Sequence, residues 1–220
     1  MKICVTSAQG LGKTTYIQDF LKEWPMYKTS EKTYRDAIKE KGLVINEEGS
    51  EESQRIILNV LVDQAIEYSK EDNVILDRCV LDNLAYTSWL ALNDKVSEKF
   101  LDETRLIVRE TLKLYDILFF FPISKFNNIP LEHDGLRSTD PQYREEIDIL
   151  FKVFQSSYMS GDGRIFPSEE CPALIELYGS REERIKLTSL YITPEGKPYG
   201  DDQSLVSDIA MPPEKQIIVP

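Results

Sequence analysis

Histidine and cysteine are scarce in this 220-residue sequence, which contains one histidine and three cysteines. The cysteines, Cys4, Cys79 and Cys171, are far apart and odd in number, so the sequence predicts reduced thiols rather than a disulfide framework. With only His133 beside them, the sequence also lacks the ligands of a zinc cluster. These shortages exclude a disulfide-rich secreted domain and a structural zinc site.

Long apolar runs and surplus positive charge are missing as well. No stretch approaches the roughly 18 apolar residues of a membrane span, and the apolar run in residues 1–6 is too short for a signal peptide, so we expect a cytoplasmic protein. Lys and Arg number 26 against 38 Asp and Glu, which gives a net charge of −12. This field repels polyanions, so any phosphate site must be a local concentration of cations.

Strand-like and helix-like segments alternate along the chain, which is typical of a parallel sheet covered by helices. Short continuous apolar runs predict buried strands at 2–6, 74–76, 117–121 and 173–178. Helical spacing of apolar residues predicts helices over 13–24, 57–68, 82–92 and 97–114, after Pro141 and after Ser180. We expect an α/β fold with a five-stranded parallel sheet over residues 1–190. The Pro-rich and Gly-rich segment 191–220 predicts an irregular C-terminal extension, with a hairpin near residues 194–197.

Residues 7–15 carry the most specific pattern in the sequence. Ser-Ala-Gln-Gly-Leu-Gly-Lys-Thr-Thr matches the phosphate-loop pattern G-x-x-x-x-G-K-[ST], with serine in place of the first glycine. In such a loop, backbone N–H groups and the positive end of the next helix surround phosphates. Lys13 would reach the β and γ phosphates, and the Thr14 hydroxyl would hold Mg²⁺. The predicted nucleotide-binding residues are Gln9, Gly10, Leu11, Gly12, Lys13, Thr14 and Thr15.

Asp77 and Arg78 follow the predicted strand 74–76 directly. In a parallel sheet, this carboxylate emerges at the same edge as the phosphate loop, where ligands bind. Asp77 either holds the water shell of Mg²⁺ or accepts the proton of an attacking hydroxyl, and Arg78 can grip phosphate oxygens. The sequence has no Asn-Lys-x-Asp, the guanine-reading signature, so a switch GTPase is disfavoured.

Residues 77–86, Asp-Arg-Cys-Val-Leu-Asp-Asn-Leu-Ala-Tyr, resemble the aspartate-arginine segment of thymidylate-kinase-like enzymes. They are more similar still to the P-loop family that contains nicotinamide riboside kinase domains and many phage-encoded nucleotide kinases. Residues 115–120, 134–140 and 179–184 resemble that family in the same order, so the resemblance covers about residues 1–190. It implies a three-layer P-loop kinase fold and defines the reaction type better than the acceptor.

Two arginines near the predicted helix after Pro141 indicate a lid over the phosphates at about residues 125–145. Arg137 and Arg144 flank the start of this helix, and mobile arginines that close over phosphates stabilise the charge of phosphoryl transfer. Surface ion pairs with neighbouring acidic residues are the alternative. His133 fits a lid residue better than a catalytic base. The resemblance further implies that Arg181 stacks on adenine, and a surface position is its alternative.

The acceptor site is predicted between the phosphate loop and residues 34–55, because kinases of this shape hold the acceptor against the segment after the first helix. Tyr34 is a candidate for base stacking, and Arg35 and Arg55 are candidates for an acceptor phosphate. Asp82 either contacts the acceptor or caps its own helix.

The sequence thus predicts a kinase that uses ATP and Mg²⁺ to phosphorylate a nucleoside or nucleoside monophosphate, with Lys13, Asp77, Arg78, Arg137 and Arg144 in catalytic roles. A phage-type kinase acting on a hydroxymethylated base in DNA is one alternative, which the net charge of −12 disfavours. A nucleotide-binding regulatory ATPase is the alternative from another class. We expect a small-molecule partner and no membrane association, and leave a homodimer open.

Overall fold

A computed structural model describes residues 1–31, 33–124 and 138–199 of the chain. These residues form four strands, seven α-helices and a short 3₁₀ helix at Asn46–Glu48. The strands are β1 (Lys2–Thr6), β2 (Val74–Asp77), β3 (Ile117–Phe120) and β4 (Ala173–Glu176). The helices are α1 (Lys13–Glu23), α2 (Tyr34–Lys41), α3 (Glu51–Tyr68), α4 (Val80–Leu92), α5 (Glu98–Leu112), α6 (Pro141–Met159) and α7 (Arg181–Thr188).

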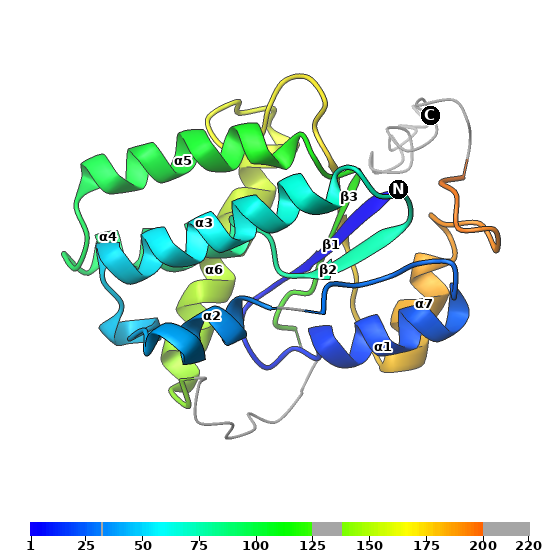
Figure 1. Ribbon diagram of the computed structural model, residues 1–220, viewed down its shortest axis with the longest axis horizontal. Coiled ribbons are helices and arrows are strands. Elements are labelled where there is room, and N and C mark those ends of the chain that lie inside the picture. The colour runs from blue at the N-terminus through cyan, green and yellow to red at the C-terminus, as the bar shows by residue number, and fades with distance from the viewer. Residues whose placement is uncertain (32, 125–137, 200–220) are drawn as a thin grey trace, which may run out of the picture.

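The sheet has the strand order β2-β1-β3-β4, and every neighbouring pair is parallel. Figure 1 shows α1 and α7 together on one side of the sheet and α3, α4, α5 and α6 on the other. Ile3, Cys4 and Val5 of the central strand β1 are fully buried between these layers. The predicted α/β fold with a parallel sheet between helices is therefore confirmed.

The described part of the sheet has four strands rather than the five that we predicted. A fifth position beside β2 is occupied by one residue, Lys28, which forms an isolated parallel bridge with Val74. Its N–H donates to Asn73 O and its carbonyl accepts from Ile75 N, both at 2.9 Å. The residues that follow, Thr29, Ser30 and Glu31, are polar, so they offer no apolar side chains to bury against the sheet.

Local signals account for most of the helix boundaries. Pro25 follows the end of α1, and Asp140 caps α6 by accepting a hydrogen bond from Gln142 N at 2.8 Å. Ser180 opens α7 with the predicted capping box. Helix α2 was not predicted, because its apolar stripe is weak: Ile38 is its one buried residue. None of the helices in the described ranges is long and apolar enough to cross a membrane.

The chain after α7 returns to the end of α1. Residues 192–198 form a turn in which Thr193 N donates to Lys197 O at 2.7 Å, consistent with the predicted hairpin. Trp24 Nε1 donates to Thr193 O at 2.9 Å, and the Tyr27 hydroxyl donates to Gly196 O at 2.8 Å. A domain boundary at residue 190 stays a prediction, and residues 200–220 lie outside the described ranges.

Candidate active site

The phosphate loop connects β1 to α1 and closes around the ammonium group of Lys13. Gly10 and Gly12 have φ angles of 71° and 78°, the left-handed conformation that glycine adopts without strain. Lys13 Nζ donates to Ser7 O at 3.0 Å, Ser7 Oγ at 2.8 Å and Ala8 O at 2.9 Å. The serine that replaces the first glycine of the pattern therefore contributes a hydroxyl acceptor to the lysine.

Burial changes the acid–base behaviour of this lysine. Lys13 is 5% exposed, and burial, assisted by the nearby Arg78 cation, lowers its pKa from the usual 10.5 to about 7. The carboxylates of Asp82 and Asp77 act in the opposite direction and favour the protonated form. Phosphate oxygens placed beside Lys13 would also favour this charged form, so its protonation and nucleotide binding are linked.

Thr14 and Asp77, the two predicted Mg²⁺ residues, lie together at the carboxyl edge of the sheet. Thr14 Oγ1 donates to Asp77 Oδ2 at 2.8 Å. The other oxygen, Asp77 Oδ1, is buried, and no described residue forms a hydrogen bond with it. Hydroxyl and carboxylate oxygens are the ligands that Mg²⁺ and its water shell prefer, and an unpartnered buried oxygen is available for them. These residues therefore fit a Mg²⁺ site.

Arg78 lies at the end of β2 in an unusual backbone conformation, with a φ of 77°. Its Nη1 donates to Asp82 Oδ1 at 2.8 Å in a buried ion pair. The guanidinium carbon is 5.1 Å from the centre of the Tyr34 ring and 5.4 Å from that of Tyr86, within cation–π range of both. Asp82 Oδ2 accepts from Thr6 Oγ1 at 2.8 Å and caps α4 through Cys79 N at 3.0 Å. Asp82 therefore acts as a helix cap and also holds Arg78.

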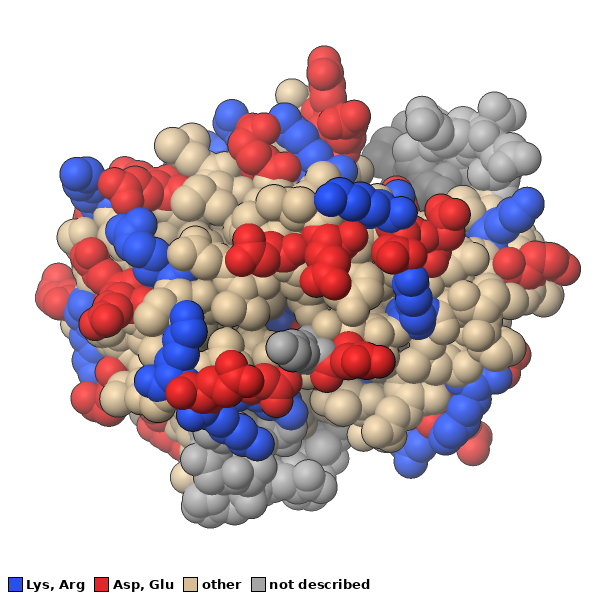
Figure 2. Space-filling model, viewed as in Figure 1, with Lys and Arg blue, Asp and Glu red and all other residues tan. Residues whose placement is uncertain are grey.

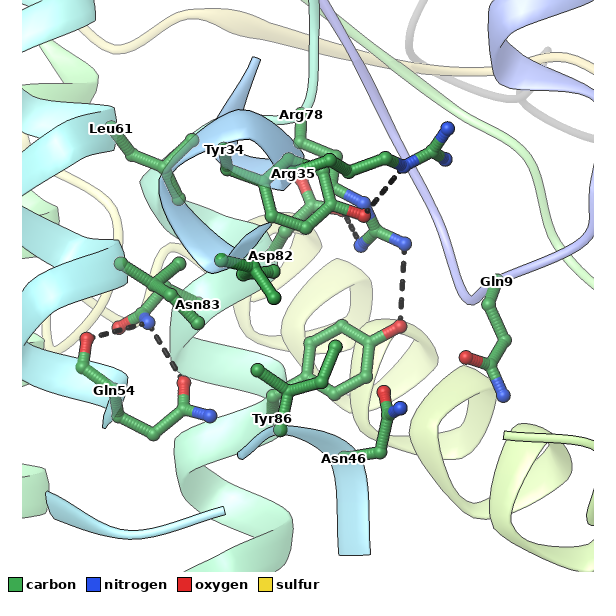
Figure 3. Close-up of a pocket in the computed structure, with 13 residues that line it drawn as sticks. Gln9, Tyr34, Arg35, Asn46, Gln54, Leu61, Arg78, Asp82, Asn83 and Tyr86 are labelled. Atoms are coloured by element: carbon green, nitrogen blue, oxygen red, sulfur yellow. Dashed lines mark hydrogen bonds and ion pairs between the residues drawn. The ribbon is translucent and has the colours of Figure 1, made fainter. Parts of the chain in front are cut away.

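A pocket opens beside the phosphate loop, between α2, α3 and α4 (Figure 3). The space between its walls, including the open solvent at its mouth, is about 570 Å³. Its walls combine branched aliphatic side chains with a few polar groups. They are Gln9, Tyr34, Arg35, Ile38, Ile45, Asn46, Gln54, Ile57, Leu61, Arg78, Asp82, Asn83 and Tyr86. Three of the four predicted acceptor residues, Tyr34, Arg35 and Asp82, line this pocket.

The fourth predicted acceptor residue, Arg55, lies elsewhere. Its side chain is 51% exposed and forms a 3.4 Å ion pair with Glu103 on α5. Its guanidinium carbon also lies 4.8 Å from the centre of the Phe100 ring. The structure therefore places Arg55 in the contact between α3 and α5, not among the pocket residues.

The segment at the start of α6 contacts the phosphate loop, as a lid would. Arg144 Nη2 donates to Gly10 O at 3.1 Å, and Gln9 Nε2 donates to Ser138 O at 2.9 Å. Arg137, His133 and residues 125–137 of the predicted lid lie outside the described residues. Arg181 is 66% exposed and forms two 2.8 Å hydrogen bonds with Asp19 of α1. Its side chain thus lies on the surface between α1 and α7.

Sequence reasoning missed a second arginine of α7. Arg184 is 3% exposed, donates to the phosphate-loop carbonyl Leu11 O at 2.7 Å, and lies 4.2 Å from the centre of the Phe121 ring. Burial lowers its pKa from 12.5 to about 10. The available signal was an arginine one turn before the buried Thr188 on the same helix face. Arg184 supports the loop from the side opposite to the pocket residues.

A buried amide pair in the pocket was also missed. Asn83 Nδ2 donates to Gln54 O at 3.0 Å and to Gln54 Oε1 at 2.8 Å. Gln54 lies on α3 and Asn83 on α4, and both are at most 3% exposed. The sequence signal for Asn83 was weak, because it is one of two adjacent polar residues, Asp82 and Asn83, between apolar residues at the start of α4, and no signal pointed to Gln54 as its partner.

A parallel sheet whose carboxyl edge carries a phosphate loop and an aspartate-arginine pair defines the P-loop kinase fold, and solved structures share it. The deoxyadenosine kinase of M. mycoides, solved with dCMP and dCDP, is 16% identical with a TM-score of 0.60, over 86% of this chain and 97% of that one. Thymidylate kinase from Candida albicans is 14% identical with a TM-score of 0.53, over 86% and 89% of the chains. The NadR protein in complex with NR is 14% identical with a TM-score of 0.62, over 91% of this chain and 53% of that one, so this chain spans about half of NadR.

The family is identified from the sequence. Residues 2–155 match the family described as an AAA domain, and the chain belongs to this family of P-loop proteins. No curated protein sequence matches the chain.

Proposed function

We propose that this protein is a kinase that transfers the γ phosphate of ATP to a nucleoside or nucleoside monophosphate in the presence of Mg²⁺. One observation carries the proposal: the phosphate loop and a second, partly apolar pocket share the same edge of the sheet, and Gln9 of the loop lines that pocket. A site for a triphosphate and a site for a small organic molecule therefore adjoin. This arrangement suits transfer between two bound molecules, because catalysis of phosphoryl transfer consists mainly of positioning and charge stabilisation.

Each residue at this edge has a role that follows from its position. Lys13 binds the phosphates of the donor, and Thr14 and Asp77 would hold the water shell of Mg²⁺. The chemistry supplied by a bound Mg²⁺ is neutralisation of charge on the phosphate oxygens. Asp77 Oδ1 is available to orient the acceptor hydroxyl or to accept its proton. Arg78 and Arg144, together with Arg137 of the proposed lid, supply positive charge.

The pocket suits a planar, partly apolar acceptor. Tyr34 and the aliphatic side chains Ile38, Ile57 and Leu61 would flank a flat base, and Arg35 would meet an acceptor phosphate. Figure 2 shows acidic and basic side chains intermingled over the viewed face, without a continuous basic stripe among the coloured residues. Together with the net charge of −12, this distribution favours a small acceptor over long DNA.

The test is a panel of acceptors incubated with the purified protein, ATP and Mg²⁺. The panel contains nucleosides, nucleoside monophosphates, nicotinamide riboside and oligonucleotides that carry hydroxymethylated bases. We expect transfer to a nucleoside or a monophosphate, with the Asp77→Asn protein as the inactive control. If only the oligonucleotide were phosphorylated, the acceptor would be a modified DNA base instead of a nucleoside or nucleoside monophosphate. ATP hydrolysis without any phosphorylated acceptor would support a regulatory ATPase.

A further inference from the structure

Arg184 is a buried cation whose guanidinium is incompletely satisfied. Its Nη1 donates to Leu11 O at 2.7 Å, whereas Nε and Nη2 are buried and no described residue accepts a hydrogen bond from them. Within the described ranges Arg184 also forms no ion pair, in contrast to the similarly buried Arg78, which pairs with Asp82 at 2.8 Å. Burying a charge without a paired carboxylate costs free energy. The contact with the phosphate loop is therefore the one hydrogen bond that this costly position gives the guanidinium among these residues.

The backbone and side chain of Arg184 are held in place by their surroundings. The guanidinium carbon lies 4.2 Å from the centre of the Phe121 ring, just after β3. Arg184 O accepts from Thr188 Oγ1 at 2.7 Å, and that hydroxyl lies 2.7 Å from the hydroxyl of Tyr16 on α1. Figure 1 shows α1 and α7 side by side. The Leu11 carbonyl is therefore held by a helix that is itself fixed to α1, the helix that follows the loop.

The contact at Leu11 determines where the next N–H group points. The peptide bond between Leu11 and Gly12 is trans and planar, so its carbonyl and its N–H point in opposite directions. Because the carbonyl points toward α7, the N–H of Gly12 points away from α7, toward the side where the N–H groups of a phosphate loop surround phosphates. No described residue accepts a hydrogen bond from this N–H, so it is available to a phosphate oxygen.

A charged donor also changes the strength of this N–H. A hydrogen bond from a cation to a carbonyl polarises the peptide group, which makes its N–H a stronger donor. We propose that Arg184 is a positioning residue for ATP: through the peptide between Leu11 and Gly12, it directs and strengthens a backbone hydrogen bond to the phosphates. Arg184 acts without contacting the ligand, because its remaining nitrogens are buried. This inference rests on the proposed function, since it assumes that a triphosphate occupies the loop.

The experiment measures the binding of ATP and of inorganic tripolyphosphate, which has the phosphates without the nucleoside, each with Mg²⁺ by titration calorimetry. Arg184→Met removes the charged donor and keeps an unbranched side chain. We expect Kd for both ligands to rise by about tenfold, because both meet the same N–H. A rise for ATP alone would show that Arg184 acts on the nucleoside, and an unchanged Kd for both ligands would show no role in phosphate binding. Either result would overturn the proposal.

Two further variants test whether the charged donor is responsible. Arg184→Lys keeps a cation that can donate to Leu11 O, so it should recover most of the lost affinity for both ligands. Lys186→Met removes an exposed cation from the same helix and should change each Kd by less than about twofold. If Arg184→Lys bound both ligands as weakly as Arg184→Met, or if Lys186→Met weakened them equally, the charged donor at residue 184 would not explain the loss.

Steady-state kinetics separate this role from general support of the fold. Contacts with the phosphates exist before and during transfer, so Arg184→Met should raise KM for ATP while kcat changes by less than about threefold. KM for the acceptor should change by less than about twofold, because neither Leu11 nor Arg184 lines the acceptor pocket. An equal rise of KM for ATP and for the acceptor would contradict a positioning role. Thermal unfolding establishes that each variant is folded, and if Arg184→Met does not fold, the uncharged Arg184→Gln takes its place in every comparison.

These measurements distinguish failure of this inference from failure of the proposed function. If the wild type transfers phosphate and Arg184→Met binds ATP equally well, the positioning role is refuted and the kinase is kept. If Arg184→Met binds both ligands more weakly but the wild type phosphorylates no acceptor, the positioning role is kept and the kinase is refuted. A wild-type protein that binds neither ATP nor tripolyphosphate refutes both.

Discussion

The phosphate loop and the neighbouring pocket are built in opposite ways. The loop consists of consecutive residues, and its lysine is held by the carbonyls and the hydroxyl of the same segment. Most of the side chains that line the pocket come from α2, α3 and α4, which are far apart in the sequence. The loop would meet phosphates, which all nucleotides share, whereas the side chains of the pocket can distinguish one acceptor from another. Changes in the loop should therefore affect every substrate, and changes in the pocket should affect the choice among them.

Lys13→Ala is expected to have the largest effect and tests the loop half of this comparison. Losing the cation that meets the donor phosphates should lower kcat/KM by about 10²- to 10³-fold, equally for every acceptor. Steady-state kinetics with at least two acceptors measure this loss. The variant should unfold at a temperature no lower than that of the wild type, because the core does not require a buried ammonium. If kcat/KM fell for one acceptor only, the loop would also influence the choice of acceptor, contrary to the proposed contrast with the pocket.

Asp82→Asn tests the buried pair that shapes the pocket. Asp82 and Arg78 have side chains only 2% and 7% exposed, and removing one charge leaves the other buried without compensation. We expect the free energy of unfolding to fall by about 3 kcal/mol, measured by urea denaturation. The matched control is Asp102→Asn, which breaks a 2.6 Å pair with Arg105 on the surface and should leave stability almost unchanged. If both variants lowered the free energy of unfolding equally, burial would not explain the cost of breaking the pair between Asp82 and Arg78.

The pH dependence of ATP binding tests Lys13 in another way. Because burial lowers the pKa of Lys13 to about 7 and phosphates should raise it again, ATP binding above about pH 7 should take up a proton. Apparent ATP affinity should therefore fall as the pH rises toward about 9. Calorimetric titrations in buffers of different ionisation enthalpy measure the uptake, which Lys13→Met should abolish.

The same shift has a consequence for stability in the absence of ATP. The unfolded chain, in which Lys13 has its usual pKa of 10.5, binds more protons than the folded protein between about pH 7 and 10.5. The contribution of Lys13 to the free energy of unfolding should therefore rise with pH across this window. A contribution that falls across it, obtained by comparing the wild type with Lys13→Met, would contradict the lowered pKa.

Arg181→Ala is expected to have the smallest effect. Its exposed guanidinium is engaged by Asp19, so we expect KM for ATP to rise less than about threefold, with no change in acceptor preference. ATP saturation curves at a fixed acceptor concentration measure this change. A much larger rise in KM would show that Arg181 leaves Asp19 and stacks on adenine. The resemblance of the sequence to the kinase family implies this role.

The fold and the loop were predictable because their signals are contiguous in the sequence. The pocket was only partly predictable, and Arg55 shows why. Gln54 and Arg55 are neighbours in the sequence, yet about 100° of rotation per helical residue directs one into the pocket and the other toward α5. The Asn83 contact to Gln54 spans 29 residues, and that of Arg184 to Leu11 spans 173. No local pattern encodes such distant pairs, and α2, with one buried residue, left too weak a pattern to predict.

The contacts between the end of α1 and the turn at residues 192–198 bear on how the chain folds during its synthesis. Trp24 and Tyr27 each donate a hydrogen bond to a carbonyl 169 residues later. Trp24 and Tyr27 must therefore wait for partners that are translated 169 residues after them, and contacts of such separation form slowly. Until then, the indole of Trp24 lacks its hydrogen-bond acceptor. The helix that follows the phosphate loop is therefore fixed at its end only by residues that are translated much later than the loop itself.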